Sequence, residues 1–391
     1  MSTQQDHIVQ PQPVDTATRR RRLTVGFPSS ADSGELRFPI TPEGVAQLSA
    51  LGLTVYVEAG AGSPIHYSDA RYAEAGAVVG KRVESLSADI VVSLAPLSVA
   101  DTSLLRKGAM LMSLLGQGAL SAEFVRCLLL RHVTYVALEK ILSGQSQRPF
   151  ADILLETDGR VAMAVASAVL LRPEFGKGIL LGGVTGVIPC EVVVIGSGIG
   201  ARAAAASAIG MGAQVKILDN DIYGLRAATL SLGTAVATSV LQPHVVDNAL
   251  RSADVVIASP AAGFRGFTSA QLDNAKKGVV LIDLSPLSVS MFPTEKQVPI
   301  TYAQPRQNPG GRVCFRSIGN AAPRTAAMAL SNTILSLFSK LSSLDGVLSL
   351  VRADAGLQAA VCTFMGKAVS SDFAVLAGVR PLDLNLLLSC S

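Results

Sequence analysis

Short apolar runs alternate with amphipathic segments along the chain, a rhythm typical of α/β proteins with parallel sheets. In the N-terminal half, the apolar runs predict strands at 23–27, 54–58, 90–94, 110–114 and 133–137. Helices are predicted between them at 41–51, 68–75 and 121–131, and Thr41 and Ser68 are predicted to cap the first two. Gly52 and Gly76 end the first two helices. This half therefore predicts one complete doubly wound unit.

The alternation continues through the second half of the chain. A helix is predicted at 159–171, and the glycine-rich segment 176–189 predicts a tight hairpin. Strands are then predicted at 192–195, 213–218, 255–258, 279–283 and 313–315, with an Ala-rich helix at 201–211. Two further helices are predicted at 320–340 and 359–369, the last of which returns the chain to the first unit.

A glycine-rich turn joins the strand 192–195 to the Ala-rich helix. Gly196, Gly198 and Ala201 have the spacing G-x-G-x-x-A, which is typical of dinucleotide-binding units when it follows a strand and opens a helix. Gly196 permits the tight turn, Gly198 allows the backbone to approach a pyrophosphate, and Ala201 allows close packing of helix on strand. The amides at the start of the helix would then face the phosphates.

The next strand delivers Asp219, an acid about twenty residues beyond the glycines. Such an acid accepts hydrogen bonds from the adenosine ribose, and its charge repels a 2′-phosphate, so NAD is predicted over NADP. Arg202 is an observation against this preference, because a cation beside the turn tolerates the 2′-phosphate of NADP. The predicted cofactor contacts are Gly196, Ser197, Gly198, Ile199, Gly200, Ala201, Asp219, Asn220, Ser259 and Asn320.

The composition describes a well-buried protein with room for two sizeable domains. The chain has 391 residues, of which 49% are hydrophobic and 16% charged. The net charge of +4 and the absence of Trp give no support to nucleic-acid binding. Residues 1–22 form a polar leader, predicted to be disordered, that ends in the basic cluster Arg19–Arg22.

The leader matches neither a secretory signal nor an acid-poor transit peptide. No segment reaches the roughly eighteen uninterrupted apolar residues of a membrane helix, so no membrane association is predicted. The five cysteines are scattered without a C-x-x-C pair, and no histidine has a ligand spacing from them. These features predict a cytoplasmic protein without a metal site.

Several separate motifs resemble the family of alanine dehydrogenases and pyridine-nucleotide transhydrogenase α-subunits. The segment 35–62 (ELRFPITPEGVAQLSALGLTVYVEAGAG) resembles the opening signature of that family, and SDARYAEAGAVV follows in the expected place. The segment from GRVAMAVASAVLL through GGVTGVIP to the glycine turn resembles the second signature, closest to the dehydrogenase branch. The segment 319–332 (GNAAPRTAAMALSN), which contains Asn320, resembles the part that reaches the nicotinamide.

The resemblance implies an α/β fold with two Rossmann-like doubly wound domains and a cleft between them. The NAD-binding domain, 151–329, would be inserted into a discontinuous substrate domain formed by 23–150 and 330–391. The family also implies a small amino or oxo acid as the substrate and a homo-oligomer as the assembly. The apolar C-terminal stretch 382–388 agrees with such assembly.

Most catalytic positions of the dehydrogenases are substituted here. Arg37 stands where the family has an Arg that binds the substrate carboxylate. The family's Lys motif is replaced by VVSLAP, with Ser93 and Ala95 where lysines would be. Gly116 replaces the catalytic His, and Leu287 replaces an Asp near the nicotinamide. The catalytic residue is therefore unassigned, and the residues considered as substitutes are His66, His132, Glu139 and Lys140.

Three functions agree with this pattern. The first is an NAD-dependent oxidoreductase of the alanine dehydrogenase type, acting on a small acid such as L-alanine or pyruvate. The second is a non-catalytic protein that binds or senses NAD(H), because the glycine turn is intact beside a depleted substrate site. The third is a transhydrogenase-like protein that passes hydride between two nicotinamides without a protein base, and Gln117 resembles that branch.

Overall fold

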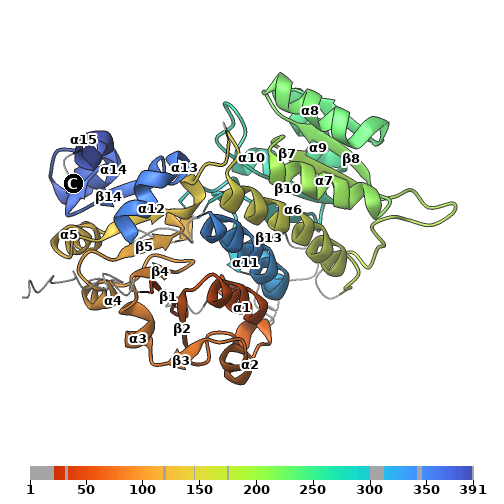
Figure 1. Ribbon diagram of the computed structural model, residues 1–391. Helices are drawn as coiled ribbons and strands as arrows, with labels where there is room; N and C mark the ends of the chain where they lie inside the picture. Colours follow the sequence, from red (N-terminus) through yellow and green to blue (C-terminus); the bar gives the residue numbers. More distant parts are fainter. Residues whose placement is uncertain are drawn as a thin grey trace, which may run out of the picture.

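The computed structural model describes residues 22–30, 34–117, 120–144, 146–173, 176–286, 288–299, 312–340 and 346–389. These residues form two largely parallel β-sheets with helices packed around them, as Figure 1 shows. The predicted fold class, two Rossmann-like units, is confirmed. Most of the leader, residues 1–21, lies outside the described residues.

The first sheet has the strand order β15-β14-β6-β5-β4-β1-β2-β3. The strands β1 to β6 are parallel, and β14 pairs antiparallel with β6. Their bounds are β1 Thr24–Phe27, β2 Thr54–Glu58, β3 Val78–Gly80, β4 Ile90–Val92, β5 Met110–Ser113, β6 Thr134–Ala137, β14 Val361–Phe364 and β15 Lys367–Ala368. The predicted strands of the N-terminal half all form, each with bounds within two residues of the prediction.

The second sheet has the order β12-β13-β11-β10-β7-β8-β9 and is parallel throughout. Its bounds are β7 Glu191–Ile195, β8 Gln214–Leu218, β9 Val236–Ser239, β10 Val255–Ala258, β11 Val280–Asp283, β12 Gln297–Pro299 and β13 Val313–Arg316. Without the edge strand β12, this is the order 3-2-1-4-5-6 of a dinucleotide-binding fold. The order reverses at β7, so the glycine turn lies at the switch point.

Helices cover both faces of each sheet. The α-helices are α1 Pro42–Ala50, α2 Asp69–Glu74, α3 Arg82–Leu86, α4 Val99–Leu104, α5 Ala122–Leu130, α6 Pro149–Leu170, α7 Ile199–Gly210, α8 Ile222–Leu232, α9 Pro243–Ser252, α10 Ser269–Asp273, α11 Pro323–Ser339, α12 Val347–Ala353, α13 Ala355–Gln358, α14 Ser371–Ala377 and α15 Leu384–Ser389. The 3-10 turns are η1 Ser63–Ile65, η2 Leu115–Gln117, η3 Leu138–Lys140, η4 Gly233–Ala235 and η5 Ile318–Ala321. Thr41 and Ser68 cap their helices as predicted, and Ser121 caps α5.

The helices α6 and α11 contact each other between the two sheets (Figure 1). The start of α6, with Phe150 and Leu154, belongs to the apolar core of the first unit, together with α11. The rest of α6, from Ala162 to Leu170, belongs to the core of the second unit. One continuous helix therefore ties the two units together.

Three predicted helices need correction. The segment predicted as a helix at 359–369 is the hairpin β14–β15, because Val361–Phe364 pairs with β6 and the turn residues Met365 and Gly366 both have positive φ. The helix predicted at 159–171 begins ten residues earlier, at Pro149, which occupies its first turn. The helix predicted at 320–340 begins at Pro323, and Asn320 lies in the preceding turn η5.

Two smaller predictions concern the surface. The glycine-rich segment forms a tight turn in which Val184 and Val187 make an antiparallel bridge, as the hairpin prediction requires. The C-terminal apolar stretch forms α15, whose Leu384, Leu387 and Leu388 pack against the first core. Within the described parts of the chain, no helix has the length and apolar character needed to cross a membrane.

Candidate functional site

The glycine turn has the backbone that its spacing predicts. Gly196 has φ of +93°, a conformation that favours glycine, and its amide donates to the carbonyl of Leu218 on β8. A Cβ at Gly196 would lie 2.3 Å from Ser259 Oγ and 3.2 Å from the carbonyl oxygen of Pro260. The turn therefore approaches the end of β10 so closely that no side chain fits at this position.

Gly198 has the opposite surroundings. Apart from Gly198 itself and its two chain neighbours, no heavy atom of the described residues lies within 4 Å of an ideal Cβ at Gly198. Gly198 is also the N-cap of α7, a 12-residue helix, and it brings no side chain to its first amides. The first turn of α7 thus offers backbone N–H groups and the positive end of the helix dipole to the space beside Gly198.

Small residues allow α7 to lie against its neighbours. Ala201 is fully buried on the second core. A Cβ at Gly159 of α6 would lie 2.1 Å from the Gly200 carbonyl oxygen and 3.0 Å from the Ala203 side chain. Small residues within 159–162 of α6 and within 198–201 at the start of α7 therefore let the two helices cross closely. This crossing sets the direction of the α7 N-terminus.

Asp219 lies buried at the carboxyl end of β8, next to the turn. Its Oδ2 accepts a hydrogen bond of 2.7 Å from Ser197 Oγ, and its Oδ1 accepts one of 3.1 Å from the amide of Asp221. Each carboxylate oxygen has further lone pairs for a hydroxyl donor. Ser197 thus links the buried acid to the glycine turn.

The other predicted cofactor residues fall into two groups. Ser259 and Asn220 border the turn: both the amide and Oγ of Ser259 donate to the Ile195 carbonyl, and Asn220 bridges Ala262 and Leu241. Asn320 lies instead where the second unit meets the first. Its amide group binds the carbonyl of Gly34 and the amide of Leu36, in the loop after β1.

Arg37 follows that same loop and is buried, with 6% of its surface exposed. Its guanidinium donates to both carboxylate oxygens of Glu35, at 2.8 and 2.6 Å. Its Nη1 lies 3.9 Å from Oδ1 of Asp158 on α6. Arg37 thus pairs with two carboxylates of the chain itself.

Asp158 was not identified from the sequence. Its Oδ1 is buried and has no hydrogen-bond partner among the described residues. Burial raises the pKa of Asp158 to about 6, although Arg37 opposes the shift. The sequence did carry one signal for Asp158. Leu154 and Ala162, one turn before and one turn after it on the same helix face, are apolar and buried, so a carboxyl between them is unusual.

Gly116 also lies where the two units approach each other. A Cβ at this position would meet a single neighbour within 4 Å among the described residues, the Pro286 Cβ at 3.9 Å. Pro286 follows β11 of the second sheet. Of the other substituted positions, Ser93 and Ala95 are buried and hydrogen-bonded to each other, whereas Leu287 lies outside the described residues.

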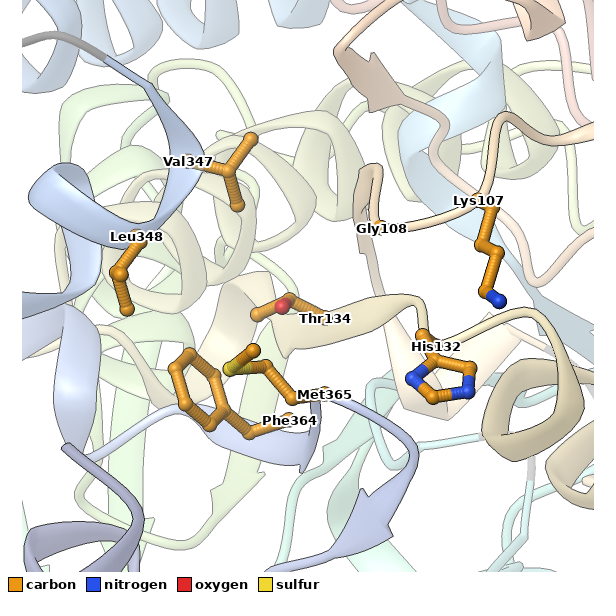
Figure 2. A pocket seen from close by; sticks show the side chains of 8 residues that line it. All are labelled: Lys107, Gly108, His132, Thr134, Val347, Leu348, Phe364 and Met365. Carbon is orange, nitrogen blue, oxygen red and sulfur yellow. The ribbon is translucent and has the colours of Figure 1, made fainter. Parts of the chain in front are cut away.

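The candidate substitutes divide between the two ends of the first sheet. Glu139 and Lys140 lie in η3, directly after the carboxyl end of β6. His132 precedes β6 at the opposite end, where Figure 2 shows it with Lys107 across from Val347, Leu348 and Phe364. His66 ends the turn η1 with φ of 60°. His66 therefore follows the carboxyl end of β2, whereas Glu139 follows the carboxyl end of β6 and contacts the amide of Leu115, the residue before Gly116.

Sequence comparisons agree with this architecture. The alanine dehydrogenase/PNT N-terminal domain matches residues 26–152, and the alanine dehydrogenase/PNT C-terminal domain matches residues 162–371. The chain belongs to the alanine dehydrogenase/PNT family. The alanine dehydrogenase of Mycolicibacterium smegmatis is 30% identical over 370 residues, which cover 93% of this chain and 97% of that protein.

Further members of the family give the same picture. The alanine dehydrogenase of Geobacillus stearothermophilus is 29% identical over 320 residues, covering 80% of this chain and 86% of that protein. A solved L-alanine dehydrogenase, 25% identical, superposes with a TM-score of 0.78 over 90% of this chain and 99% of its own. A transhydrogenase from Sinorhizobium meliloti, 22% identical, shares the fold with a TM-score of 0.71 over 89% of this chain and 99% of its own.

Proposed function

We propose that this chain is an NAD(H)-dependent oxidoreductase of the alanine dehydrogenase type, acting on a small amino or oxo acid such as L-alanine or pyruvate. The observation that carries the proposal is the open space at Gly198, at the N-terminus of α7, next to the buried acid Asp219. The named alanine dehydrogenases that this chain resembles along most of its length support the substrate class.

The residues at the glycine turn fit the pyrophosphate and the adenosine ribose of the cofactor. The α7 amides and Gly198 would hold the pyrophosphate, and Asp219 would bind the adenosine ribose. When bound, NAD supplies the acceptor for a hydride and its electron pair from the substrate carbon. Asp219 also supports NAD over NADP, because its negative charge lies where a 2′-phosphate would be placed.

The proposed domain division places the cofactor in 151–329 and the substrate on 23–150 and 330–391. The membership of β14 and β15 in the first sheet supports the return of the chain to that unit. We retain Arg37 as the proposed ligand of the substrate carboxylate, through Nη1. That nitrogen is 3.9 Å from Asp158, beyond hydrogen-bond distance, so it has a donor to give to a ligand.

Titration with NADH and NADPH, followed by nicotinamide fluorescence and calorimetry, is the first test. Binding of NADH at least tenfold tighter than NADPH is expected, and no binding of either would refute the proposal. Pyruvate with ammonium, and L-alanine in the reverse direction, are then supplied while the absorbance of reduced nicotinamide is followed. Turnover in both directions is expected.

A non-catalytic NAD(H)-binding protein is the second candidate. The loss of titratable side chains at Ser93, Ala95 and Gly116 favours it, because amino-acid oxidation needs a proton acceptor. NADH binding without turnover of any oxo acid would support this candidate. A transhydrogenase-like reaction is the third, favoured by the shared fold, and hydride exchange between NADH and an oxidised nicotinamide analogue would identify it.

We further propose a homo-oligomer. The hairpin after α6 exposes three large apolar side chains, those of Val184, Val187 and Ile188, the last of which is 80% exposed. Apolar groups at the tip of a protruding turn are typical of a surface that another copy covers. Light scattering coupled to size exclusion should give a mass of at least two chains, and I188D should reduce it.

A further inference from the structure

Glu139 occupies a distinctive place at the edge between the two units. It lies in η3, immediately after the carboxyl end of β6, the edge at which parallel sheets bind ligands. The turn η3 contacts α6, and α6 in turn contacts β11 of the second sheet. Glu139 is therefore a carboxyl of the first unit placed at the boundary with the second.

The carboxylate of Glu139 faces the loop that contains Gly116. Its Oε1 accepts a hydrogen bond of 2.7 Å from the amide of Leu115, the residue before Gly116. An ideal Cβ on Gly116 of that loop would lie 3.9 Å from the Pro286 Cβ. The hydrogen bond from Leu115 holds the carboxylate of Glu139 beside Gly116 through Oε1. The second oxygen, Oε2, is left for a different partner.

Oε2 of Glu139 is buried and has no hydrogen-bond partner among the residues that the structure describes. A buried carboxylate oxygen without a donor is costly, and native proteins rarely keep one without a use for it. The charged and titratable groups around it are Lys140, Tyr135 and Cys362. Burial raises the pKa of Glu139, and its own amide, the amides of Leu115 and Gly116 and the charge of Lys140 only partly oppose this.

We propose that Glu139 is the acid–base residue of this chain, exchanging protons at Oε2 with a substrate bound between Gly116 and Pro286. The proposal rests on the proposed function, since it assigns the proton transfers of that reaction. It also explains how the chain manages without a histidine at position 116: the carboxyl reaches the same loop from the neighbouring strand.

In the oxidative direction, Oε2 would carry each proton that moves. After hydride loss to the cofactor, the substrate carbon is double-bonded to nitrogen, and a water oxygen bonds to that carbon while Oε2 takes one proton of the water. Oε2 then gives this proton to the nitrogen. The carbon–nitrogen bond breaks with its electron pair on nitrogen, ammonia leaves, and the remaining hydroxyl proton passes through Oε2 to solvent as the carbonyl forms.

The test is E139Q, with E123Q on the exposed first turn of α5 as the matched control. E139Q should bind NADH within about twofold of the parent and keep its KM for pyruvate within about threefold. Its kcat should fall by roughly a hundredfold or more, because a general acid–base contributes about 10² to 10⁴. E123Q should keep all three values.

A second measurement does not depend on turnover. In chains labelled with ¹³C at glutamate carboxyl groups, the resonance absent from E139Q should titrate above the ordinary glutamate range. A Glu139 resonance that titrates at or below that range would overturn the proposal, because the residue would then have no proton to donate near neutral pH.

The outcomes separate the two proposals. If the parent turns over substrate and E139Q does so within threefold, Glu139 is not the acid–base and the proposed function stands. If NADH binds but the parent turns over no oxo acid, the dehydrogenase function fails and Glu139 loses the role with it. If E139Q loses NADH affinity together with kcat, the role is structural and the assignment is overturned.

Discussion

Arg37 and Asp158 form a partly buried ion pair that joins the loop after β1 to the helix α6, with Nη1 and Oδ1 3.9 Å apart. Gly319, from the second unit, packs directly against this pair. A Cβ at Gly319 would lie 2.2 Å from Oδ1 of Asp158 and 3.2 Å from Nη1 of Arg37. Glu35 already satisfies the other side of the guanidinium. One cation therefore faces two carboxylates, and the second carboxylate is the one that lacks a hydrogen bond.

Replacement of that second carboxylate should stabilise the protein. Burial raises the pKa of Asp158 to about 6 in the folded chain, so the folded state binds more protons than the unfolded state between about pH 4 and 6. Stability is therefore expected to fall as pH rises through this window. At pH 7, D158N should be more stable by about 1 to 2 kcal/mol, a figure discounted for the partial exposure of the side chain.

Denaturant unfolding of the parent and D158N at pH 4, 5, 6 and 7 measures this effect. The stability of the two should converge at pH 4, because the parent carboxyl is then protonated. E156Q on the same helix, whose carboxylate makes an exposed pair with Arg160, should change stability by less than about 0.5 kcal/mol. A less stable D158N at pH 7 would mean that attraction to Arg37 outweighs the cost of burial.

The two glycines of the turn should respond differently to alanine. In G198A, the added methyl group meets no neighbour in the described structure, and the backbone, at φ of −67°, suits any residue. The melting temperature should therefore stay within about 2 °C, while NADH affinity falls at least tenfold because the methyl group occupies the pyrophosphate position. Thermal unfolding and NADH fluorescence titration check the two parts.

G196A is the comparison, since φ of +93° and the 2.3 Å approach to Ser259 Oγ make a side chain strained there. It should lose about 1 to 3 kcal/mol of stability as well as NADH binding. Unchanged NADH affinity in G198A would show that no phosphate approaches this turn.

These contrasts explain what the sequence could predict. The strand 192–195, the turn and Asp219 were predictable because each signal is local: an apolar run, a glycine spacing and an acid at a strand end. The segment 359–369 was mispredicted because its pairing partner, β6, is more than two hundred residues away, and this long-range pairing overrides local propensity. The sequence did not identify Asp158, and it gave Glu139 only as one of four candidates. The reason is the same, because the surroundings of both carboxyls come from elements distant in sequence.

Removal of the acid at the end of β8 tests the ribose site. D219A should weaken NADH binding by about 2 to 4 kcal/mol, the value of one or two charge-assisted hydrogen bonds. It should also reduce the preference for NADH over NADPH, because the repelling charge is gone. Calorimetric titration with both nucleotides measures the change, and D273A, an exposed acid of the same unit, serves as the control. Equal NADH affinity in D219A and the parent would contradict the ribose assignment.

The space at Gly116 makes a gain of function testable. The nearest described neighbour of an added Cβ is Pro286 at 3.9 Å, and the backbone is not left-handed, so a histidine fits without displacing the main chain. In G116H the imidazole would stand beside the Leu115 amide and Glu139, with a pKa suited to proton transfer near neutrality.

The double variant G116H/E139Q should therefore turn over at least tenfold faster than E139Q. The pH dependence of its rate should reflect the titration of an imidazole in place of a carboxyl. G116A in the same background fills part of the space without a titratable group and should restore nothing. Steady-state rates with pyruvate, ammonium and NADH between pH 5 and 9 distinguish these cases. Equal rates for G116H and G116A would mean that the reacting nitrogen lies out of reach of position 116, and the substrate would then have to be placed elsewhere between the two units.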